Sequence, residues 1–200
     1  MPESSSSDLH GNAPDHSPVA LLLIDVVNDL DFEGSEALLE HALPMADRIA
    51  ELKRRARAAN VPVVYVNDNF GQWRSDFEAT VEHCLKDGVP GEPIVRLLAP
   101  DERDYFVLKP KHSGFYTTSL DLLLNHIGAK TLVLTGMAGD ICILFTAGDA
   151  YLRDYKLVIP RDCIASNTVE ENEAALKLMA KVVKADTRPS EEIDFAALMR

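Results

Sequence analysis

Short apolar runs alternate along the chain with segments whose apolar residues recur at helical spacing. The run Val-Ala-Leu-Leu-Leu-Ile at 19–24 is continuous, which is typical of a parallel strand that is covered on both faces. The same kind of pattern predicts further strands at 62–66, 105–109, 131–135, 156–160 and 181–185.

Helical spacing predicts the segments between these strands. We expect one helix at 44–59, with Pro44 in its first turn, and others at 119–127, from Cys142 onward, and at 169–180. Regular β-α alternation predicts an α/β fold, because parallel strands need crossover connections. The expected architecture is three-layered and Rossmann-like, with a mostly parallel sheet of about six strands and helices on both faces. We expect the segment 67–104 to consist mainly of loops with one short helix. A long loop segment of this kind in a compact domain is often a lid over the binding site.

Composition limits the classes of partner. With 200 residues, 46% of them hydrophobic, the chain fits one domain, predicted at 18–200 and preceded by a polar, Ser-rich, disordered tail at 1–17. The formal charge of −12 argues against nucleic acid or an anionic membrane as partner, because phosphate binding needs a basic surface. The three cysteines do not form a disulfide framework or a C-x-x-C pair, and the N-terminus lacks the apolar core of a signal peptide. A reducing, cytoplasmic location is therefore expected.

Polar residues that carry chemistry follow several of the predicted strands. Asp25 comes after the first strand, Asn67 and Asp68 come after the second, Lys109 ends the third, and Cys142 follows the fourth. In doubly wound folds, ligands bind beyond these carboxyl ends of the strands. An acid, an amine and a thiol are thus expected at one edge of the sheet.

That combination suits nucleophilic catalysis. A thiol attacks as thiolate, and we expect a helix N-terminus and Lys109 to lower the pKa of Cys142, with Asp25 as general base. Each residue alone also fits a structural role: a small buried hydrophobe for the cysteine, a solvated strand end for the lysine, and a cap or turn for the aspartate.

Three ordered blocks carry a resemblance to a known family. Asp25-Val-Val-Asn28-Asp29-Leu30, the segment from Lys109 through Ser113 to Phe115, and the segment from Gly136 to Cys142 followed by Thr-Ala-Gly-Asp-Ala match in order and spacing. Together they resemble the isochorismatase-like cysteine hydrolases from Val19 to about Ala180.

The resemblance implies roles for single positions. Cys142 would attack a carbonyl and form a covalent acyl-enzyme, Asp25 would shuttle the proton, and Lys109 would orient the pair. A cis peptide bond between Met137 and Ala138 is implied as well, with the N–H groups of Ala138 and Cys142 as the oxyanion hole. A homo-oligomer, a dimer or a tetramer, is implied only by the resemblance.

Departures from the family pattern narrow the expected substrate. The nicotinamidase branch binds a metal through D-x-H after the second strand, whereas Asp68 is followed here by Asn69 and Phe70, so we expect no metal and no cofactor. Val27 and Leu30 replace a glutamine and an aromatic residue, which argues against nicotinamide. Isochorismatases that cleave a vinyl ether commonly lack the cysteine. The expected substrate is a small carboxamide, ureido or N-carbamoyl compound, and the candidate substrate-binding residues are Leu30, Asn67, Trp73, Phe115 and Tyr116.

Three other functions were compared with the residues of the sequence: nucleotide binding, a structural scaffold, and hydrolysis of a different bond. A nucleotide-binding protein is disfavoured because the turn Gly-Met-Ala-Gly-Asp-Ile lacks G-x-G-x-x-G and a Walker lysine. A catalytically silent scaffold would keep the fold without using the thiol. A hydrolase of an ester, lactam or vinyl ether would keep the site but cleave a different bond.

Overall fold

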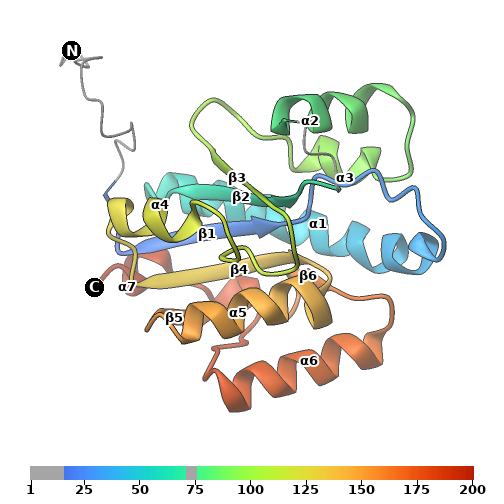
Figure 1. The fold of residues 1–200 in the computed structure, drawn as a ribbon. Coiled ribbons are helices and arrows are strands. Elements are labelled where there is room, and N and C mark those ends of the chain that lie inside the picture. Colours follow the sequence, from blue (N-terminus) through green and yellow to red (C-terminus); the bar gives the residue numbers. More distant parts are fainter. Residues whose placement is uncertain (1–15, 71–75) are drawn as a thin grey trace, which may run out of the picture.

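The fold is a parallel six-stranded sheet with helices on both faces, as predicted (Figure 1). The computed structural model describes residues 16–70 and 76–200, so most of the predicted tail and Trp73 lie outside the described residues. The strand order is β3-β2-β1-β4-β5, with β6 beside the end of β4, and every pairing is parallel. The strands are β1 (Val19–Ile24), β2 (Val63–Asp68), β3 (Tyr105–Lys109), β4 (Thr131–Met137), β5 (Lys156–Val158) and β6 (Ile164–Ala165).

The helices form two layers. Side chains of α1, α2, α3 and α7 pack in one hydrophobic cluster, and side chains of α4, α5 and α6 pack in a second cluster on the other face of the sheet. The helices are α1 (Ser35–Ala58), α2 (Phe77–Lys86), α3 (Glu92–Leu97), α4 (Leu120–Ile127), the π-helical turn η1 (Gly139–Ile143), α5 (Leu144–Tyr151), α6 (Val169–Val182), the short 3-10 turn η2 (Ser190–Glu192) and α7 (Phe195–Leu198).

The central strand β1 shows why its sequence is continuously apolar. Successive side chains of a strand point to opposite faces. Leu21 and Leu23 pack in the cluster around α1, whereas Leu22 and Ile24 pack in the cluster around α5, and all four are fully buried. A strand buried on both faces leaves its carboxyl end as the place where polar residues reach the surface.

The predicted start of the first long helix was wrong. Helix α1 begins at Ser35, and Pro44 lies inside it. Proline removes one hydrogen bond within a helix. The buried positions Leu38, Ala42 and Met45 nevertheless keep helical spacing across Pro44, and their packing against the sheet maintains the helix.

Two other elements differ from prediction. The segment 67–104 holds α2 and α3 rather than one short helix; Asp76 caps α2 by accepting a hydrogen bond from the N–H of Ala79, and Phe77 anchors it in the core. The predicted strand at 181–185 was also wrong, because α6 extends to Val182 and only Asp186 forms a bridge, with Val158. Val182 is the last residue of this helix and Val183 is its C-cap, and Ala175 and Met179 are the buried residues of the helix.

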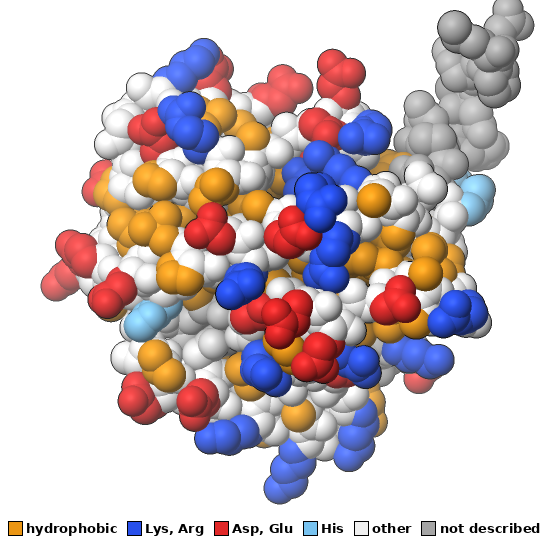
Figure 2. Space-filling model, turned by 180° about the vertical axis from the view of Figure 1, so that it is seen from behind, with side chains coloured by type: hydrophobic (Ala, Val, Ile, Leu, Met, Phe, Trp, Pro, Cys, Tyr) orange, Lys and Arg blue, Asp and Glu red, His pale blue; other side chains and the backbone are white. Residues whose placement is uncertain are grey.

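Charges of both signs are interspersed on the rear of the molecule, where Asp and Glu lie beside Lys and Arg (Figure 2). Among residues 16–70 and 76–200, no helix is long and apolar enough to cross a bilayer.

Gly136 fixes the path of the chain into the candidate site. Its φ is 117°, and a Cβ atom there would lie 2.0 Å from the carbonyl oxygen of Ile24. Gly136→Ala is therefore expected to lower the free energy of unfolding by about 2 kcal/mol or more. Gly148→Ala is the matched control: the site is helical and nothing lies within 4 Å, so the substitution should raise stability by about 0.5–1 kcal/mol. Urea unfolding measures both, and equal stabilities for the two variants would contradict the argument.

Candidate active site

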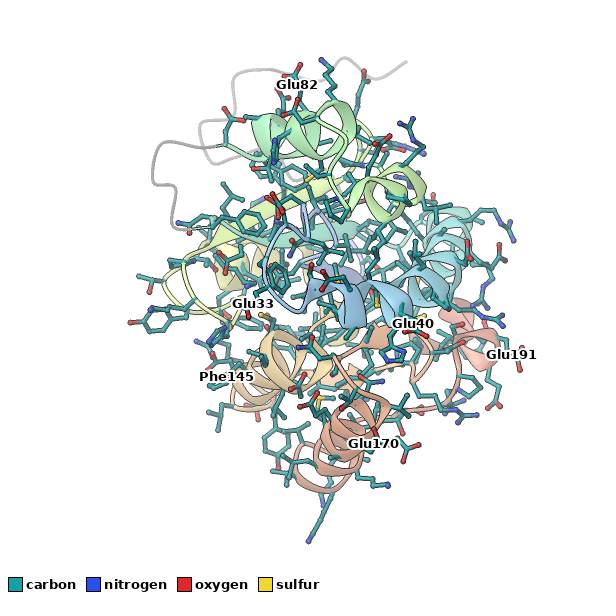
Figure 3. All side chains as sticks on the ribbon, turned by 90° about the vertical axis from the view of Figure 1, so that its right-hand side faces the viewer. Glu33, Glu40, Glu82, Phe145, Glu170 and Glu191 are labelled. Atoms are coloured by element: carbon teal, nitrogen blue, oxygen red, sulfur yellow. The ribbon has the colours of Figure 1, made fainter. Side chains whose placement is uncertain are left out.

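Four polar side chains meet at the carboxyl ends of neighbouring strands. Asp25 follows β1, Asp68 ends β2, Lys109 ends β3, and Cys142 lies in η1 directly after β4. Because β3, β2, β1 and β4 are adjacent in the sheet, these ends lie along one edge, which faces the viewer in Figure 3. The edge predicted from the sequence to hold a site thus brings Asp25, Lys109 and Cys142 together.

The ammonium group of Lys109 is the centre of this cluster. Its Nζ lies 2.8 Å from Asp25 Oδ2, 3.3 Å from Asp68 Oδ2 and 3.5 Å from Cys142 Sγ. Its side chain has an exposed fraction of 0%. A buried cation with two carboxylates and a thiol around it is held at a fixed position.

The carboxyl of Asp25 is held on several sides. Its Oδ1 accepts a hydrogen bond from the N–H of Asp68 at 2.6 Å, and Oδ2 faces Lys109. The thiol of Cys142 is a further hydrogen-bond partner of this carboxyl. Asp25 itself has a φ of 53°, which turns the chain out of β1 and aims the carboxyl at its partners. This arrangement places a base beside the sulfur.

The loop after β1 is fixed by Asn67. The side chain of Asn67 accepts a hydrogen bond from the N–H of Val27 at 3.1 Å and donates one to its carbonyl at 2.8 Å. Asn67 has an exposed fraction of 0%. The structure therefore places this predicted substrate-binding residue in the support of the Asp25 loop, with its amide occupied by backbone groups.

Burial controls the protonation of the site. Burial raises the pKa of Asp25, although Lys109 and the hydrogen bonds act in the opposite direction. Burial also raises the pKa of the Cys142 thiol to about 12, and the negative charge of Asp25 adds to this effect. Burial lowers the pKa of Lys109, but Asp25, Cys142 and Asp68 raise it by more.

The expectation that the pKa of Cys142 is lowered was therefore wrong. Lys109 does favour the thiolate, but desolvation and the carboxylate of Asp25 outweigh it. The resting site holds a thiol beside an aspartate–lysine ion pair.

The turn that carries Cys142 has a defined backbone. The peptide bond between Met137 and Ala138 is cis, as the resemblance implied. The carbonyl of Ala138 accepts hydrogen bonds from the N–H groups of Ile141 and Ile143, and the N–H of Asp140 donates to Ser166 Oγ at 3.2 Å. The chain therefore enters α5 through a π-helical turn rather than a regular first turn.

The other predicted substrate-binding residues differ in burial. Leu30 and Phe115 are buried in the two hydrophobic clusters, with exposed fractions of 0% and 5%. Phe115 packs against the ring of Tyr155. Tyr116 is exposed, and Trp73 lies outside the described residues.

Sequence reasoning missed two neighbours of the cluster. Asp68 was placed at this edge and weighed as a metal ligand, but its pairing with Lys109 was not predicted. His112 was not among the candidate site residues, yet its Nδ1 lies 4.0 Å from Cys142 Sγ. The spacing K-P-K-H, which places His112 in the loop that Lys109 begins, was the available signal.

Within the described part of the chain, no group of three or more His, Cys, Asp or Glu side chains has an arrangement that could hold a metal ion. At the end of β2, Asp68 Oδ2 pairs with Lys109, and Asp68 Oδ1 accepts a hydrogen bond from the N–H of Phe70.

The parallel sheet, with Asp25, Lys109 and Cys142 together at its carboxyl edge, is the arrangement that the family resemblance implied, and the comparisons identify the same family. The isochorismatase domain model matches residues 19–188, so the chain belongs to the isochorismatase family. The isochorismatase family protein YaaI of Bacillus subtilis is 41% identical over 174 residues, which cover 87% of this chain and 95% of the relative.

Two further relatives carry names that state an activity. The ureidoacrylate amidohydrolase RutB of Methylorubrum extorquens is 28% identical over 185 residues, covering 74% of this chain and 70% of the relative. The crystal structure of N-carbamoylsarcosine amidase from Thermoplasma acidophilum aligns with a TM-score of 0.69 at 30% identity, covering 88% and 98% of the two chains. The chain is thus similar to hydrolases of small molecules.

Proposed function

We propose that the protein is a cysteine-dependent amidohydrolase that cleaves a C–N bond of a small ureido, N-carbamoyl or carboxamide compound through an acyl-enzyme. The observation that carries this proposal is the contact of one sulfur with both an ion-paired base and a buried ammonium group. Lys109 Nζ lies 3.5 Å from Cys142 Sγ and 2.8 Å from Asp25 Oδ2. A scaffold that did not use the thiol would have no need of this costly burial of charge.

Acylation begins with proton transfer. As Cys142 Sγ attacks the carbonyl carbon, its proton passes to the carboxylate of Asp25, and the ammonium group of Lys109 stabilises the negative charge on sulfur. The N–H groups of Ala138 and Cys142 hold the oxyanion. The C–N bond then breaks, the proton on Asp25 passes to the leaving nitrogen, and an amine or ammonia departs.

Deacylation uses the same groups in reverse. Water attacks the acyl carbon, gives one proton to Asp25, and displaces the sulfur. The proton then returns to sulfur, so that the thiol and the carboxylate of the resting site are restored. The acid or carbamate product leaves, and no redox partner is required.

The relatives support the ureido and N-carbamoyl classes. One is named for ureidoacrylate and the other for N-carbamoylsarcosine, and both names describe a carbonyl flanked by nitrogen. A thiol nucleophile with a proton shuttle suits such a bond, because the leaving nitrogen has to be protonated.

Ammonia release from a matched panel tests the proposal. The panel pairs ureido acids and N-carbamoyl amino acids with plain carboxamides and with esters of similar shape, and Cys142→Ala is measured beside the wild type without added metal. We expect ammonia release from ureido or N-carbamoyl members by the wild type alone. Ester cleavage without any amide cleavage, or release that survives in Cys142→Ala, would contradict the proposal.

The raised pKa of Asp25 predicts the acid limb of activity. A protonated Asp25 accepts no proton from the thiol, and burial places its pKa above the usual range near ~4. Activity is therefore present above this raised pKa and lost as the pH falls through it. The pH profile of kcat/KM should show an acid limb at higher pH than an ordinary carboxyl would give. A limb at or below the ordinary value would contradict the role of burial.

A further inference from the structure

His112 lies beside the sulfur on its exposed side. Its Nδ1 is 4.0 Å from Cys142 Sγ, and its side chain is exposed. Asp25 and Lys109, the other ionisable neighbours of the sulfur, have exposed fractions of only 5% and 0%. The thiol therefore has buried charged groups on one side and faces solvent on the other. His112 lies on the side that faces solvent.

The loop that carries His112 is braced against α5. Ser113 Oγ donates a hydrogen bond to Asp149, and the N–H of Gly114 donates to Thr146 Oγ1 at 3.0 Å. The ring of His112 also packs on Phe145 of α5, with 5.5 Å between the ring centroids. Phe145 lies where α5 borders the loop that follows β3, as its label in Figure 3 shows. These contacts hold the imidazole near the sulfur even though it is exposed.

We infer that His112 is a fifth ionisable member of the site, which in its protonated form donates an Nδ1–H hydrogen bond to the thiolate of Cys142 from the solvent side. The inference rests on the proposed function in that both use Cys142 as nucleophile. A cationic imidazole beside a thiolate lowers the free energy of the charged sulfur.

The charged groups around the sulfur are not balanced without a further cation. Lys109 already balances one carboxylate, but Asp25 and Asp68 are both within reach of it, so the two carboxylates outnumber the one buried ammonium group before any thiolate forms. Histidine is the side chain that changes its charge between pH 5 and 8. The positive charge and the Nδ1–H hydrogen bond that favour the thiolate are present only while the imidazole carries both of its protons.

Alkylation of Cys142 by iodoacetamide tests this without a substrate. Rates are measured from pH 5.5 to 9 by mass spectrometry of the Cys142 peptide, which separates it from the buried Cys84 and Cys163. The variants are His112→Phe, which keeps a flat ring against Phe145, and His112→Gln. His126→Phe, an exposed histidine of α4, is the matched control.

At pH 6 we expect both His112 variants to react about three- to tenfold more slowly than the wild type and His126→Phe, and we expect the rates to converge at pH 9. If the ratio of variant to wild-type alkylation rates is the same at every pH, His112 only packs against Phe145. If the rates are equal at pH 6, His112 does not act on the sulfur. Either result overturns the inference but leaves the proposed function standing. If Cys142 reacts in every variant and at every pH no faster than the buried cysteines, the inference and the proposed function both fail.

Discussion

Replacing Asp25 with Asn is expected to lower kcat/KM for the substrate found in the panel by about 10³-fold while leaving the thiol open to alkylation. The amide cannot accept the thiol proton, so attack and leaving-group protonation both lose their proton carrier. The negative charge of Asp25 is also one cause of the raised pKa of Cys142. Removing it lowers that pKa, because Lys109 remains.

The two effects of this substitution separate catalysis from reactivity. At pH 8, Asp25→Asn should react with iodoacetamide faster than the wild type, although it turns over substrate far more slowly. A variant that merely misfolds loses both properties. Turnover within about tenfold of the wild type would contradict the assignment of Asp25 as the proton shuttle.

Replacing Lys109 with Met is expected to remove activity and to destabilise the fold. Methionine keeps the length of the buried stem but leaves the carboxyl of Asp25 without its cation, at a cost of about 3–5 kcal/mol. Without Lys109, the thiolate also loses the cation that favours it, so that alkylation of Cys142 slows.

The destabilisation of Lys109→Met should depend on pH. Burial already raises the pKa of Asp25 in the folded protein, and the loss of Lys109 raises it further. The ionised carboxyl then opposes folding, so the penalty is absent at low pH and grows as the pH rises from the unfolded pKa through the folded one. Urea unfolding at several pH values measures this.

The double variant Asp25→Asn/Lys109→Met is the control for this prediction. It removes both charges of the pair, so much of the lost stability should return. If the double variant is as unstable at neutral pH as the sum of the two single ones, the loss comes from packing and not from an unpaired charge.

The sheet could be predicted from the sequence because its signal is local. Strands such as β1 are continuous apolar runs, and the residues that follow them mark the carboxyl edge. The start of α1 could not be predicted in this way. Pro44 is a strong local signal for a helix start, and only packing of the residues on both sides of it reveals that the helix continues.

The site was predictable as a set of residues but not as an electrostatic environment. The places of Asp25, Lys109 and Cys142 followed from strand ends and from the family blocks. The sign of the pKa shift of Cys142 depends on how deeply the sulfur is buried and how close Asp25 lies, and neither can be read from spacing. His112 was missed because a lone histidine three residues after Lys109 is a weak signal until its distance to the sulfur is known.

The central claim is that Cys142 becomes covalently acylated during hydrolysis of a C–N bond. The most direct test is the intact mass of the protein after an acid quench during turnover of the best panel substrate, followed by peptide mapping. We expect the mass of the acyl group on Cys142 in the wild type, and no added mass in Cys142→Ala, which also releases no ammonia. Steady turnover with no adduct in the wild type, together with ammonia release by Cys142→Ala, would contradict the account.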